Sequence, residues 1–290
     1  MTVSTPKVSI GIPLYNNART LDRALRSLQA QTFQNFSALL SDDGSNDATM
    51  QIAEDYAKRD ARFTVVRQPK NLNYGNFRYV LEMAQSEYFL FAAGDDWWAP
   101  EFMEQCVRVL DANPEVVGAV SKVMFVDDNG TLIEALGAFE LIGSSSENIQ
   151  RYLRNPSDNS RMYGVFRTAA AKFAFPRNDH HAFDWTFSAA TLMHGTHVQI
   201  PQALMFREIT PSHKYVQYVR RDAATAIDKV LPLRGLTSAL LFEKRVPISI
   251  GLLRALAAAN LQAHSAYMRQ FHPRYWRAFG WTLERVSWRL

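Results

Sequence analysis

The chain has 290 residues, 47% hydrophobic and 21% charged, with a formal net charge of +4. This composition is typical of a globular protein with a full core and excludes a disordered chain. The single cysteine, Cys106, excludes internal disulfides and thiolate zinc clusters and favours a reducing compartment. The positive charge favours anionic partners such as nucleotides, phosphates or acidic lipids.

The N-terminal stretch lacks the basic run and apolar segment of a signal peptide. No uncharged apolar run reaches the roughly 18–20 residues that span a bilayer. We therefore expect a cytoplasmic protein, peripheral at most on the cytoplasmic face of the inner membrane.

Short apolar runs alternate with amphipathic stretches through the first hundred residues. The runs 7–13, 36–40, 63–67 and 88–93 predict strands. The stretches 20–31, 48–59 and 76–84 predict helices, with Thr20 as the cap of the first. This alternation predicts right-handed βαβ units and a mostly parallel sheet, whose strand ends share the edge where open α/β sheets bind ligands.

Three loops follow strands at that edge: 13–17, 42–47 and 94–98. Two of them contain adjacent acids, Asp42-Asp43 and Asp95-Asp96. Adjacent carboxylates beside an apolar core repel each other unless a cation neutralises them. Carboxylate oxygens suit Mg²⁺ or Mn²⁺, so the acids predict a divalent-metal site.

Each acid pair also has a structural interpretation. Asp95 or Asp96 is a good N-cap for a helix that begins at Pro100, because Asp is favoured at the cap and Pro in the first turn. The acids of 42–47 suit a turn followed by a helix cap. Residues alone leave both interpretations open.

The segments VSIGIPLYN at 8–16, QTF at 31–33, SDDGSND at 41–47 and GDD at 94–96 occur in the order and spacing of the family-2 glycosyltransferases. The chain resembles that family over about residues 6–215. The resemblance implies an α/β fold of GT-A type, a Rossmann-like, mostly parallel mixed sheet flanked by helices. It divides the chain into a catalytic domain, 1–215, and a C-terminal helical appendage, 216–290.

By this resemblance, the first two loops hold the nucleoside of a nucleotide-sugar. The residues implied are Pro13, Tyr15, Asn16 and Asp42, with Asp43 in support. The acids after the fourth strand hold ribose and the cation on the diphosphate. Ala93 stands where the family's LDxDD pattern has its first acid, so Asp95 and Asp96 divide two roles, and which of them takes the metal stays open.

Three basic residues are further candidates. Arg78, near the start of a helix that follows an Asn-rich segment, is placed to reach the diphosphate. Arg207 and His213 follow the strand predicted at 198–207, where related enzymes often have such residues near the donor phosphates, and His213 is a candidate metal ligand. The alternative for all three is an ordinary surface charge.

Sugar transfer with inversion requires a base that removes the proton of the acceptor hydroxyl. The family places this base in an acid-containing motif that opens a helix, and Asp184 occupies that position here. A helix cap is the alternative for Asp184, and Asp179 is a competing acid. We interpret His180 and His181 as loop residues, because sequence neighbours rarely bind one zinc ion without a third ligand.

The remaining elements before residue 216 are assigned by pattern. The stretch 102–112 predicts a helix, and 116–126 and 161–167 predict strands. The acids of 127–130 suit a hairpin turn. We expect polar loops at 143–148 and 155–160, the most mobile segments.

The C-terminal region is helical by apolar spacing, at 222–230, 235–244, 248–264 and 269–290. From Lys244 onward it has eight basic residues and one acid, interleaved with tryptophans near the end. Such a tail suits contact with an anionic membrane surface. Packing on the catalytic domain or in a homodimer is the alternative, and no nucleic-acid motif accompanies it.

Together these observations predict an inverting, metal-dependent glycosyltransferase. It would move a sugar from a nucleotide-diphosphate donor, a UDP-sugar first, to a hydroxyl of a glycan or polyprenyl-linked glycan in surface polysaccharide synthesis. A sugar-phosphate nucleotidyltransferase is an alternative, but no Gly-rich phosphate loop with a downstream Lys follows the first strand. A non-catalytic nucleotide-sugar-binding scaffold is the other, and the missing acid at Ala93 favours it.

Overall fold

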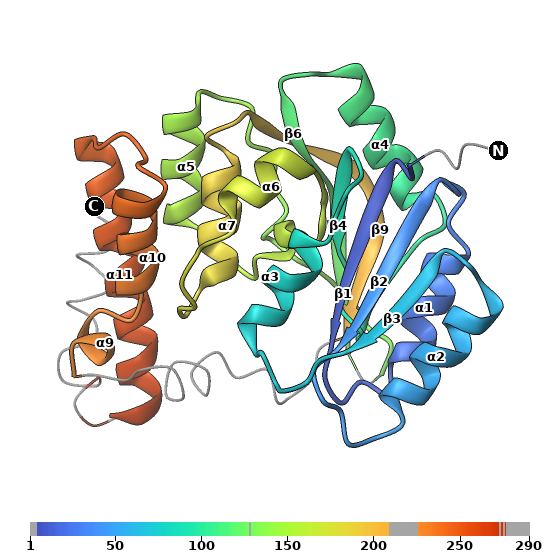
Figure 1. Ribbon diagram of the computed structural model, residues 1–290. Coiled ribbons are helices and arrows are strands. Elements are labelled where there is room, and N and C mark those ends of the chain that lie inside the picture. The colour runs from blue at the N-terminus through green and yellow to red at the C-terminus, as the bar shows by residue number, and fades with distance from the viewer. Residues whose placement is uncertain (1–4, 128, 209–225, 273, 275, 277–290) are drawn as a thin grey trace.

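The computed structural model of the chain describes residues 5–127, 129–208, 226–272, 274 and 276. In this part of the chain, a single nine-stranded sheet lies between layers of helices (Figure 1). The strand order is β3-β2-β1-β4-β8-β6-β9-β5, and β7 pairs with β6.

The elements follow the sequence closely in the first half of the chain. The strands are β1 (Val8–Leu14), β2 (Phe36–Asp42), β3 (Phe63–Arg67), β4 (Tyr88–Phe91), β5 (Asp96–Trp98), β6 (Val116–Val126), β7 (Leu132–Glu134), β8 (Val165–Arg167) and β9 (Thr196–Glu208). The helices up to β9 are α1 (Leu21–Gln29), α2 (Thr49–Arg59), α3 (Tyr74–Glu82), α4 (Phe102–Ala112), α5 (Ser145–Arg154), the 3₁₀ turn η1 (Ser160–Tyr163), α6 (Thr168–Ala174) and α7 (Phe183–Thr191). The C-terminal helices are α9 (Ala226–Val230), α10 (Arg234–Ser238), the π-helical turn η2 (Ala239–Glu243) and α11 (Ile250–Phe271).

The sheet has a parallel half and a mixed half. Strand β1 pairs in parallel with β2 and β4, and β2 pairs in parallel with β3. Strand β8 is antiparallel to both β4 and β6, whereas β6 and β9 run parallel along most of their length. The carboxyl ends of β1, β2, β3 and β4 therefore meet at one edge, as the βαβ pattern predicts.

Both faces of the sheet are buried at β4, which explains the unbroken apolar run of this strand. Tyr88 and Leu90 belong to the core under α1, α2 and α4. Phe89 and Phe91 belong to the core under α3, α6 and α7. Because successive strand residues point to opposite faces, a strand buried on both sides must be apolar at every position.

Helix α1 buries Leu21, Leu25 and Leu28 on one stripe, as its spacing predicts. Thr20 occupies the N-cap position, but the prediction that its side chain caps the helix is wrong. The Thr20 hydroxyl instead donates to the Gly94 carbonyl at 2.7 Å. This hydrogen bond ties the start of α1 to the loop that contains the second acid pair.

The segment between β7 and β8 differs most from expectation. The predicted loop at 143–148 is the start of α5, which opens with a capping box between Ser144 and Glu147. The predicted strand at 161–167 begins only at Val165, because residues 160–163 form η1 and turn Arg161 into the core. A Cβ on Gly164 would lie 2.5 Å from Val120, so this glycine permits close contact with β6.

The turn after β6 agrees with prediction. The Asp127 carboxylate accepts hydrogen bonds from the backbone N–H groups of Asn129 and Thr131. Asp127 is therefore a turn residue of the β6–β7 hairpin, and Asp128 lies outside the described residues.

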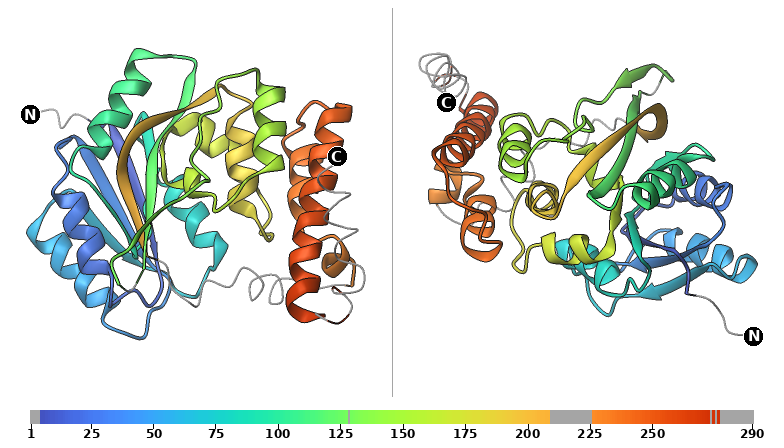
Figure 2. Two further views of the ribbon diagram at one scale, coloured as in Figure 1. Left: turned by 180° about the vertical axis from the view of Figure 1, so that it is seen from behind. Right: turned by 90° about the horizontal axis from the view of Figure 1, so that it is seen from above.

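The described part of the C-terminal region packs on the rest of the chain. Leu252, Leu256 and Ala259 of α11 share a core with Ile149 and Tyr152 of α5. Figure 2 shows α11 lying along the outside of α5. Among the helices the structure describes, none is long and apolar enough to cross a membrane. The boundary predicted at 215 and most of the predicted 269–290 helix lie outside the described residues.

Close packing of α3 on β1 generates a stability prediction. A Cβ at Gly11 would lie 2.6 Å from Val80 of α3 and 2.8 Å from Phe89 of β4, which is tighter than side chains allow. We expect Gly11→Ala to lower the free energy of unfolding by about 1–3 kcal/mol, measured by urea denaturation. Gly75→Ala is the matched control, because its nearest neighbour is 3.5 Å away, and it should not destabilise the protein. Equal stability of the two variants would contradict this account of the packing.

Candidate active site

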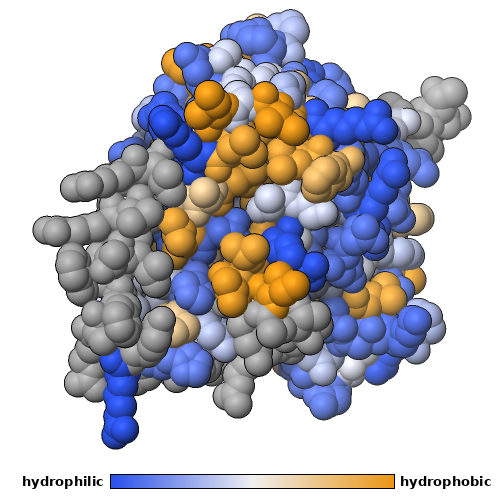
Figure 3. Space-filling view, turned by 90° about the vertical axis from the view of Figure 1, so that its left-hand side faces the viewer, coloured by the Kyte–Doolittle hydropathy of each residue, from blue (hydrophilic) through white to orange (hydrophobic). Residues whose placement is uncertain are grey.

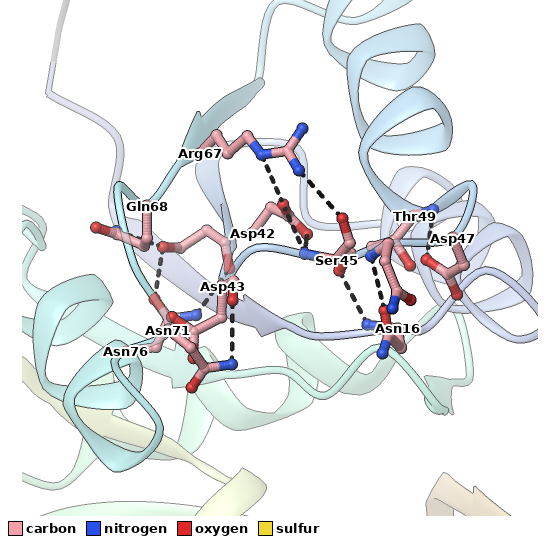
Figure 4. A network of polar contacts seen from close by, with 12 residues as sticks. Asn16, Asp42, Asp43, Ser45, Asp47, Thr49, Arg67, Gln68, Asn71 and Asn76 are labelled. Atoms are coloured by element: carbon pink, nitrogen blue, oxygen red, sulfur yellow. Dashed lines mark hydrogen bonds and ion pairs between the residues drawn. The ribbon is translucent and has the colours of Figure 1, made fainter.

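The loops after β1 and β2 hold each other in place. The Asn16 backbone N–H donates to the Ser45 hydroxyl at 2.9 Å, and its side-chain carbonyl accepts from the Asn46 N–H at 3.0 Å. Asn17 N–H donates to the Thr49 hydroxyl at 2.7 Å. Asn16 has a φ of 53°, a conformation that Asn tolerates better than most residues. Figure 4 shows the contact between Asn16 and Ser45.

The two adjacent acids after β2 have different surroundings. Asp42 is fully buried, and its carboxylate accepts from the Ser45 N–H at 3.2 and 3.3 Å, with Arg67 Nε 3.8 Å away. The two carboxylate oxygens of Asp43 accept instead from the N–H groups of Leu72 at 2.6 Å and Asn73 at 2.9 Å. The Asn71 side-chain amide donates to the Asp43 backbone carbonyl at 3.1 Å (Figure 4). Asp42 thus closes the turn, and Asp43 anchors the chain entering α3.

A hollow of about 300 Å³ opens beside Asp43, and we call it the α3 hollow. Its lining residues are Pro13, Leu14, Tyr15, Asp43, Asn71, Asn73, Tyr74, Asn76 and Phe77. Aromatic and apolar walls with a few polar groups are typical of small-ligand sites, and Asp43 supplies the only carboxylate in that lining. The hollow suits a planar heterocycle that presents an N–H group.

Some of the residues predicted to bind the nucleoside line the α3 hollow, and the others hold the conformation of the loops beside it. Pro13, Tyr15 and Asp43 line the α3 hollow, and the Tyr15 side chain is half exposed. Asn16 and Asp42 are not among the lining residues, and they hold the loop conformations instead. The Asn residues of 71–76 also line the hollow, although only their position before a helix marked them in the sequence.

Arg78 does not line the α3 hollow. Its guanidinium donates to the Asp179 carboxylate at 2.7 Å and to the Pro176 carbonyl at 3.2 Å. It also lies over the Phe175 ring. Arg78 therefore connects α3 to the segment before α7, and its only described carboxylate partner is Asp179, the acid considered as an alternative base.

The second acid pair does not cap a helix. Asp96 begins β5, which pairs antiparallel with β9 and places Asp96 opposite Arg207. Helix α4 begins later, at Phe102. The capping interpretation of Asp95 and Asp96 is therefore wrong, because a strand stands between these acids and the helix.

Asp96 is buried against Arg207. The residue is 2% exposed, and Arg207 Nε lies 3.3 Å from Oδ2 and 3.4 Å from Oδ1. Burial raises the pKa of the Asp96 carboxyl to about 7, although Arg207 opposes the rise, and the Asp95 charge adds to it. Within the described residues, Oδ2 of Asp96 accepts no hydrogen bond.

That buried oxygen decides whether the acids suit a divalent cation. A buried carboxylate oxygen without a donor is costly alone, and a hard cation satisfies it. Asp95 is adjacent and half-buried, so the two residues fit a Mg²⁺ or Mn²⁺ ion that takes its other ligands from water and phosphate. No group of three metal-ligating acids, histidines or cysteines occurs in the described ranges, and His213 lies outside them.

Asp184 is the second residue of α7. The Asn159 side-chain amide donates to its Oδ2 at 2.9 Å. The neighbouring Phe183 ring packs against Tyr74 and Phe77, which line the α3 hollow, with centroid separations of 4.8 and 5.3 Å. The start of α7 thus lies beside the wall of the hollow.

His180 is held within its own segment. Its ring nitrogens lie 3.0 Å from the Asn178 carbonyl and 2.8 Å from the Thr186 hydroxyl, and burial lowers its pKa. These contacts agree with the interpretation of His180 as a structural residue.

The sequence interpretation missed the connection between the acid sites. Arg207 Nη1 donates to the Ser160 hydroxyl at 3.2 Å, and the preceding residue, Asn159, binds Asp184. The sequence of residues 155–160 predicts a mobile loop, because Asn, Asp and Ser are ordinary turn residues. No local pattern distinguishes a turn that joins two distant acids from one that does not.

The parallel half of the sheet, the mixed half that follows it and the paired acids at the strand ends define a GT-A type fold, which confirms the predicted fold class. The family model for glycosyl transferase family 2 matches residues 9–174. The chain therefore belongs to glycosyl transferase family 2.

Two relatives from Bacillus subtilis each match less than half of the chain. The glycosyltransferase EpsH of Bacillus subtilis (strain 168) is 35% identical over 131 residues, which are 45% of this chain and 38% of EpsH. EpsE of the same organism is 32% identical over 119 residues, 40% of this chain and 43% of EpsE. The chain thus spans less than half the length of these relatives.

Solved structures match nearly the whole chain at low identity. S. aureus TarS 1-349 in complex with UDP-GlcNAc has a TM-score of 0.61 at 18% identity, covering 97% of this chain and 90% of that one. The mannosyltransferase PcManGT from Pyrobaculum calidifontis, in complex with GDP-Man and Mn²⁺, has a TM-score of 0.53 at 16% identity, covering 98% and 86%. At this identity the likeness concerns the fold.

The raised pKa of Asp96 generates a prediction for the metal-free protein. Its folded pKa of about 7 exceeds the ordinary value of 3.8, so the folded state holds this proton more tightly than the unfolded state. The resulting stabilisation is full below pH about 4 and is lost as the pH rises through 7. In urea unfolding with EDTA, the free energy of unfolding of wild type relative to Asp96→Asn should fall by on the order of 2 kcal/mol between pH 5 and pH 8.

Subtracting the free energy of unfolding of Asp96→Asn from that of wild type cancels the contributions of the other titrating groups, including the buried histidines. A difference that stays constant, or that rises with pH, would show that Asp96 is not a buried acid with a raised pKa.

Proposed function

We propose that this protein is an inverting, metal-dependent glycosyltransferase that moves a sugar from a nucleotide-diphosphate donor to an acceptor hydroxyl. The observation that carries the proposal is the arrangement of three groups at one sheet edge. These are the α3 hollow with Asp43, the buried Asp96 beside Asp95, and Asp184 at the start of α7. Each suits one requirement of the reaction. The hollow suits binding of the nucleobase, the paired acids suit binding of the diphosphate through a cation, and Asp184 suits removal of the acceptor proton.

The hollow favours a uracil donor. An ionised carboxylate accepts hydrogen bonds and donates none, so Asp43 recognises a base with an N–H group on its pairing edge. Uracil and guanine present a protonated ring nitrogen there, whereas cytosine and adenine present an unprotonated ring nitrogen and donate only through their exocyclic amino groups. TarS, the structural neighbour with the higher TM-score, was solved with UDP-GlcNAc, which supports a UDP-sugar as the first donor to test.

The cation would be Mn²⁺ or Mg²⁺, held by Asp95 and Asp96. When bound there, it would offset the negative charge that develops on the departing diphosphate. Arg207 holds Asp96 in place from β9, and Arg23 donates to the Asp95 carbonyl at 3.2 Å. These contacts orient the acids before any ligand binds, which lowers the cost of forming the site.

Asp184 acts as the general base in this proposal. It removes the proton of the acceptor hydroxyl while that oxygen attacks the anomeric carbon from the side opposite the diphosphate. The bond to the diphosphate breaks in the same step, and the configuration at the anomeric carbon inverts. Without a base near the hollow, the scaffold alternative would be favoured, so the position of Asp184 supports an enzyme.

Donor binding tests this proposal. Thermal denaturation should show stabilisation by UDP and UDP-GlcNAc with Mn²⁺ or Mg²⁺, and little with EDTA. A ligand at about 100 times its Kd adds about 2.7 kcal/mol, which raises the melting temperature by several degrees. CDP should have a smaller effect than UDP, because cytosine lacks the ring N–H that we assign to Asp43 and donates only through its amino group.

Two variants locate the binding site. Asp96→Asn should lose the metal-dependent part of the shift, and Asp43→Asn should lose the preference for UDP over CDP. Asp127→Asn is the matched acid-to-amide control in the β6–β7 turn, and it should bind as wild type does. No stabilisation by any nucleotide in the presence of metal would sink the donor site as proposed.

The acceptor is proposed to be a glycan or a polyprenyl-linked glycan at an anionic membrane surface. Four large apolar side chains are exposed in or next to the turn between η2 and α11: Phe242 at 76%, Ile248 at 67%, Ile250 at 73% and Leu253 at 47%. Arg245 and Arg254 are exposed among them. Figure 3 shows apolar side chains gathered on the face that the C-terminal helices present. Apolar groups flanked by cations suit the boundary of an anionic bilayer.

Vesicle sedimentation tests the membrane contact. Wild type should sediment with phosphatidylglycerol-containing vesicles and much less with phosphatidylcholine alone. The double change Ile248→Ser and Ile250→Ser should weaken binding about tenfold or more. Leu132→Ser removes an apolar group of β7 that is 54% exposed and should bind normally. If light scattering instead shows a dimer that the double change dissociates, the face is an interface between copies and the membrane proposal fails.

A further inference from the structure

The residues 158–160 lie between the two acid sites. The Asp158 carboxylate accepts from the N–H groups of Leu136 and Gly137 at 2.9 and 3.0 Å, and also from the Ser160 N–H at 2.8 Å. Asp158 therefore pins this short segment to the chain that follows β7. The segment is not a free surface turn, and its next two side chains are held in defined directions.

Asn159 points toward Asp184 from a buried position. It is 2% exposed and has a φ of 50° and a ψ of 31°, the left-handed region. Its Nδ2 donates to Asp184 Oδ2 at 2.9 Å, and its Oδ1 accepts from the hydroxyls of Tyr152 at 2.6 Å and Ser188 at 3.0 Å. Every hydrogen bond of this side chain joins α5 or α7 to the segment.

Chemistry determines which way round the Asn159 amide lies. An ionised carboxylate is only an acceptor, so the NH₂ group must face Asp184. The reverse orientation would set a carbonyl oxygen against a carboxylate oxygen. The hydroxyls of Tyr152 and Ser188 can donate, so they satisfy the amide carbonyl on the other side.

We propose that Asn159 is a positioning residue for Asp184. Its amide holds one carboxylate oxygen and leaves the other, Oδ1, to receive the proton of the acceptor hydroxyl. This inference rests on the proposed function, because it assumes that Asp184 is the base. In the described part of the chain, Asn159 provides the one hydrogen bond to the Asp184 carboxylate.

The hydrogen bond has two physical consequences for a base. It restricts rotation of the carboxylate about its Cβ–Cγ bond, so that Oδ1 keeps one direction. It also stabilises the ionised form of the carboxylate, because the amide donates to it. A base that stays ionised at working pH is ready to accept a proton.

Ser160, the next residue, connects the segment that holds Asp184 to the proposed diphosphate site at Asp96. Ser160 accepts from Arg207, which in turn pairs with Asp96. Two successive side chains thus contact the base and the partner of a proposed metal ligand. A shift of this segment would move both sites together, which keeps the acceptor side in register with the donor side.

Other titratable groups face Asp184 and must be controlled. They are Tyr152 of α5, Tyr163 of η1 and His180 before α7. Burial raises the pKa of both tyrosines, so they stay neutral in the acid range. Burial lowers the pKa of His180, which in turn faces Glu243 and Asp179. His180→Gln therefore serves as a background in which the imidazole titration is absent.

The test is the pKa of Asp184 itself, measured on the full chain by NMR with ¹³C-labelled aspartate carboxyls. The Asp184 signal is the one that disappears in Asp184→Asn. Asn159→Gly removes the amide and keeps a residue that tolerates the left-handed backbone. We expect the Asp184 signal to titrate at higher pH in this variant than in wild type, because the ionised carboxylate loses a hydrogen bond.

A matched control separates positioning from packing. Tyr152→Phe removes a hydrogen bond from the far side of Asn159 but leaves the amide on Asp184. It should shift the Asp184 pKa by less than a third of the Asn159→Gly effect. An equal shift in both variants would overturn the proposal, because the network would then act only through packing. An unchanged pKa in Asn159→Gly would also overturn it.

A second variant covers a failure of Asn159→Gly to fold. Asn159→Asp keeps the size and the backbone preference but replaces the donor with an acceptor, so it should raise the Asp184 pKa further. If the Asp184 pKa is not raised in Asn159→Asp, the proposal is wrong.

Kinetics distinguish this inference from the proposed function. With UDP-GlcNAc and polyprenyl-linked sugars as acceptors, Asn159→Gly should lower kcat about tenfold to a hundredfold, leave the donor KM unchanged and move the acid limb of the kcat profile upward. Full activity of Asp184→Asn, with normal donor binding, would remove the base from the proposed function. Loss of activity in Asp184→Asn but wild-type kcat and pH profile in Asn159→Gly would overturn the positioning role alone.

Discussion

The buried pairing of Asp96 with Arg207 is the interaction on which the arrangement of the site depends. It exists because β5 pairs antiparallel with β9, so a residue just after β4 lies opposite one near the end of the last described strand. A buried ion pair contributes little net stability but penalises the loss of either partner. Its effect here is to lock the loop after β4, which contains Asp95, onto the mixed half of the sheet.

From that pair, contacts extend to the remaining parts of the site. Arg207 reaches Ser160, and the same short segment presents Asn159 to Asp184. On the other side, Thr20 ties the loop of the acids to α1. The α3 hollow is joined to α7 through the packing of Tyr74 on Phe183. The three chemical functions therefore belong to one contiguous network, and each is held by residues far away in sequence.

Much of the fold was predictable because its signals are local. The strands and helices up to β4 follow from apolar periodicity, as does α4, and the parallel order follows from their alternation. The prediction was poorer between β7 and β8. There Ser144 and Glu147 form a capping box that begins a helix, and Arg161 turns inward to contact His197, a partner 36 positions later. Neither the inward turn nor its partner follows from neighbouring residues.

The sequence by itself determined where the candidate residues stand along the chain, because residue type and spacing are sufficient for that. It places two acid pairs after apolar strands, an Asn-rich segment before a helix, and Asp184 at the start of another helix. Only the tertiary structure decided what each does. It uses Asp42 to close a turn and makes Asp43 part of the lining of the hollow, although the two are adjacent and identical in type. It likewise buries Asp96 and leaves Asp95 half-buried. The physical reason is that burial and hydrogen-bond partners come from strand pairing and helix packing between distant segments, which a local pattern does not contain.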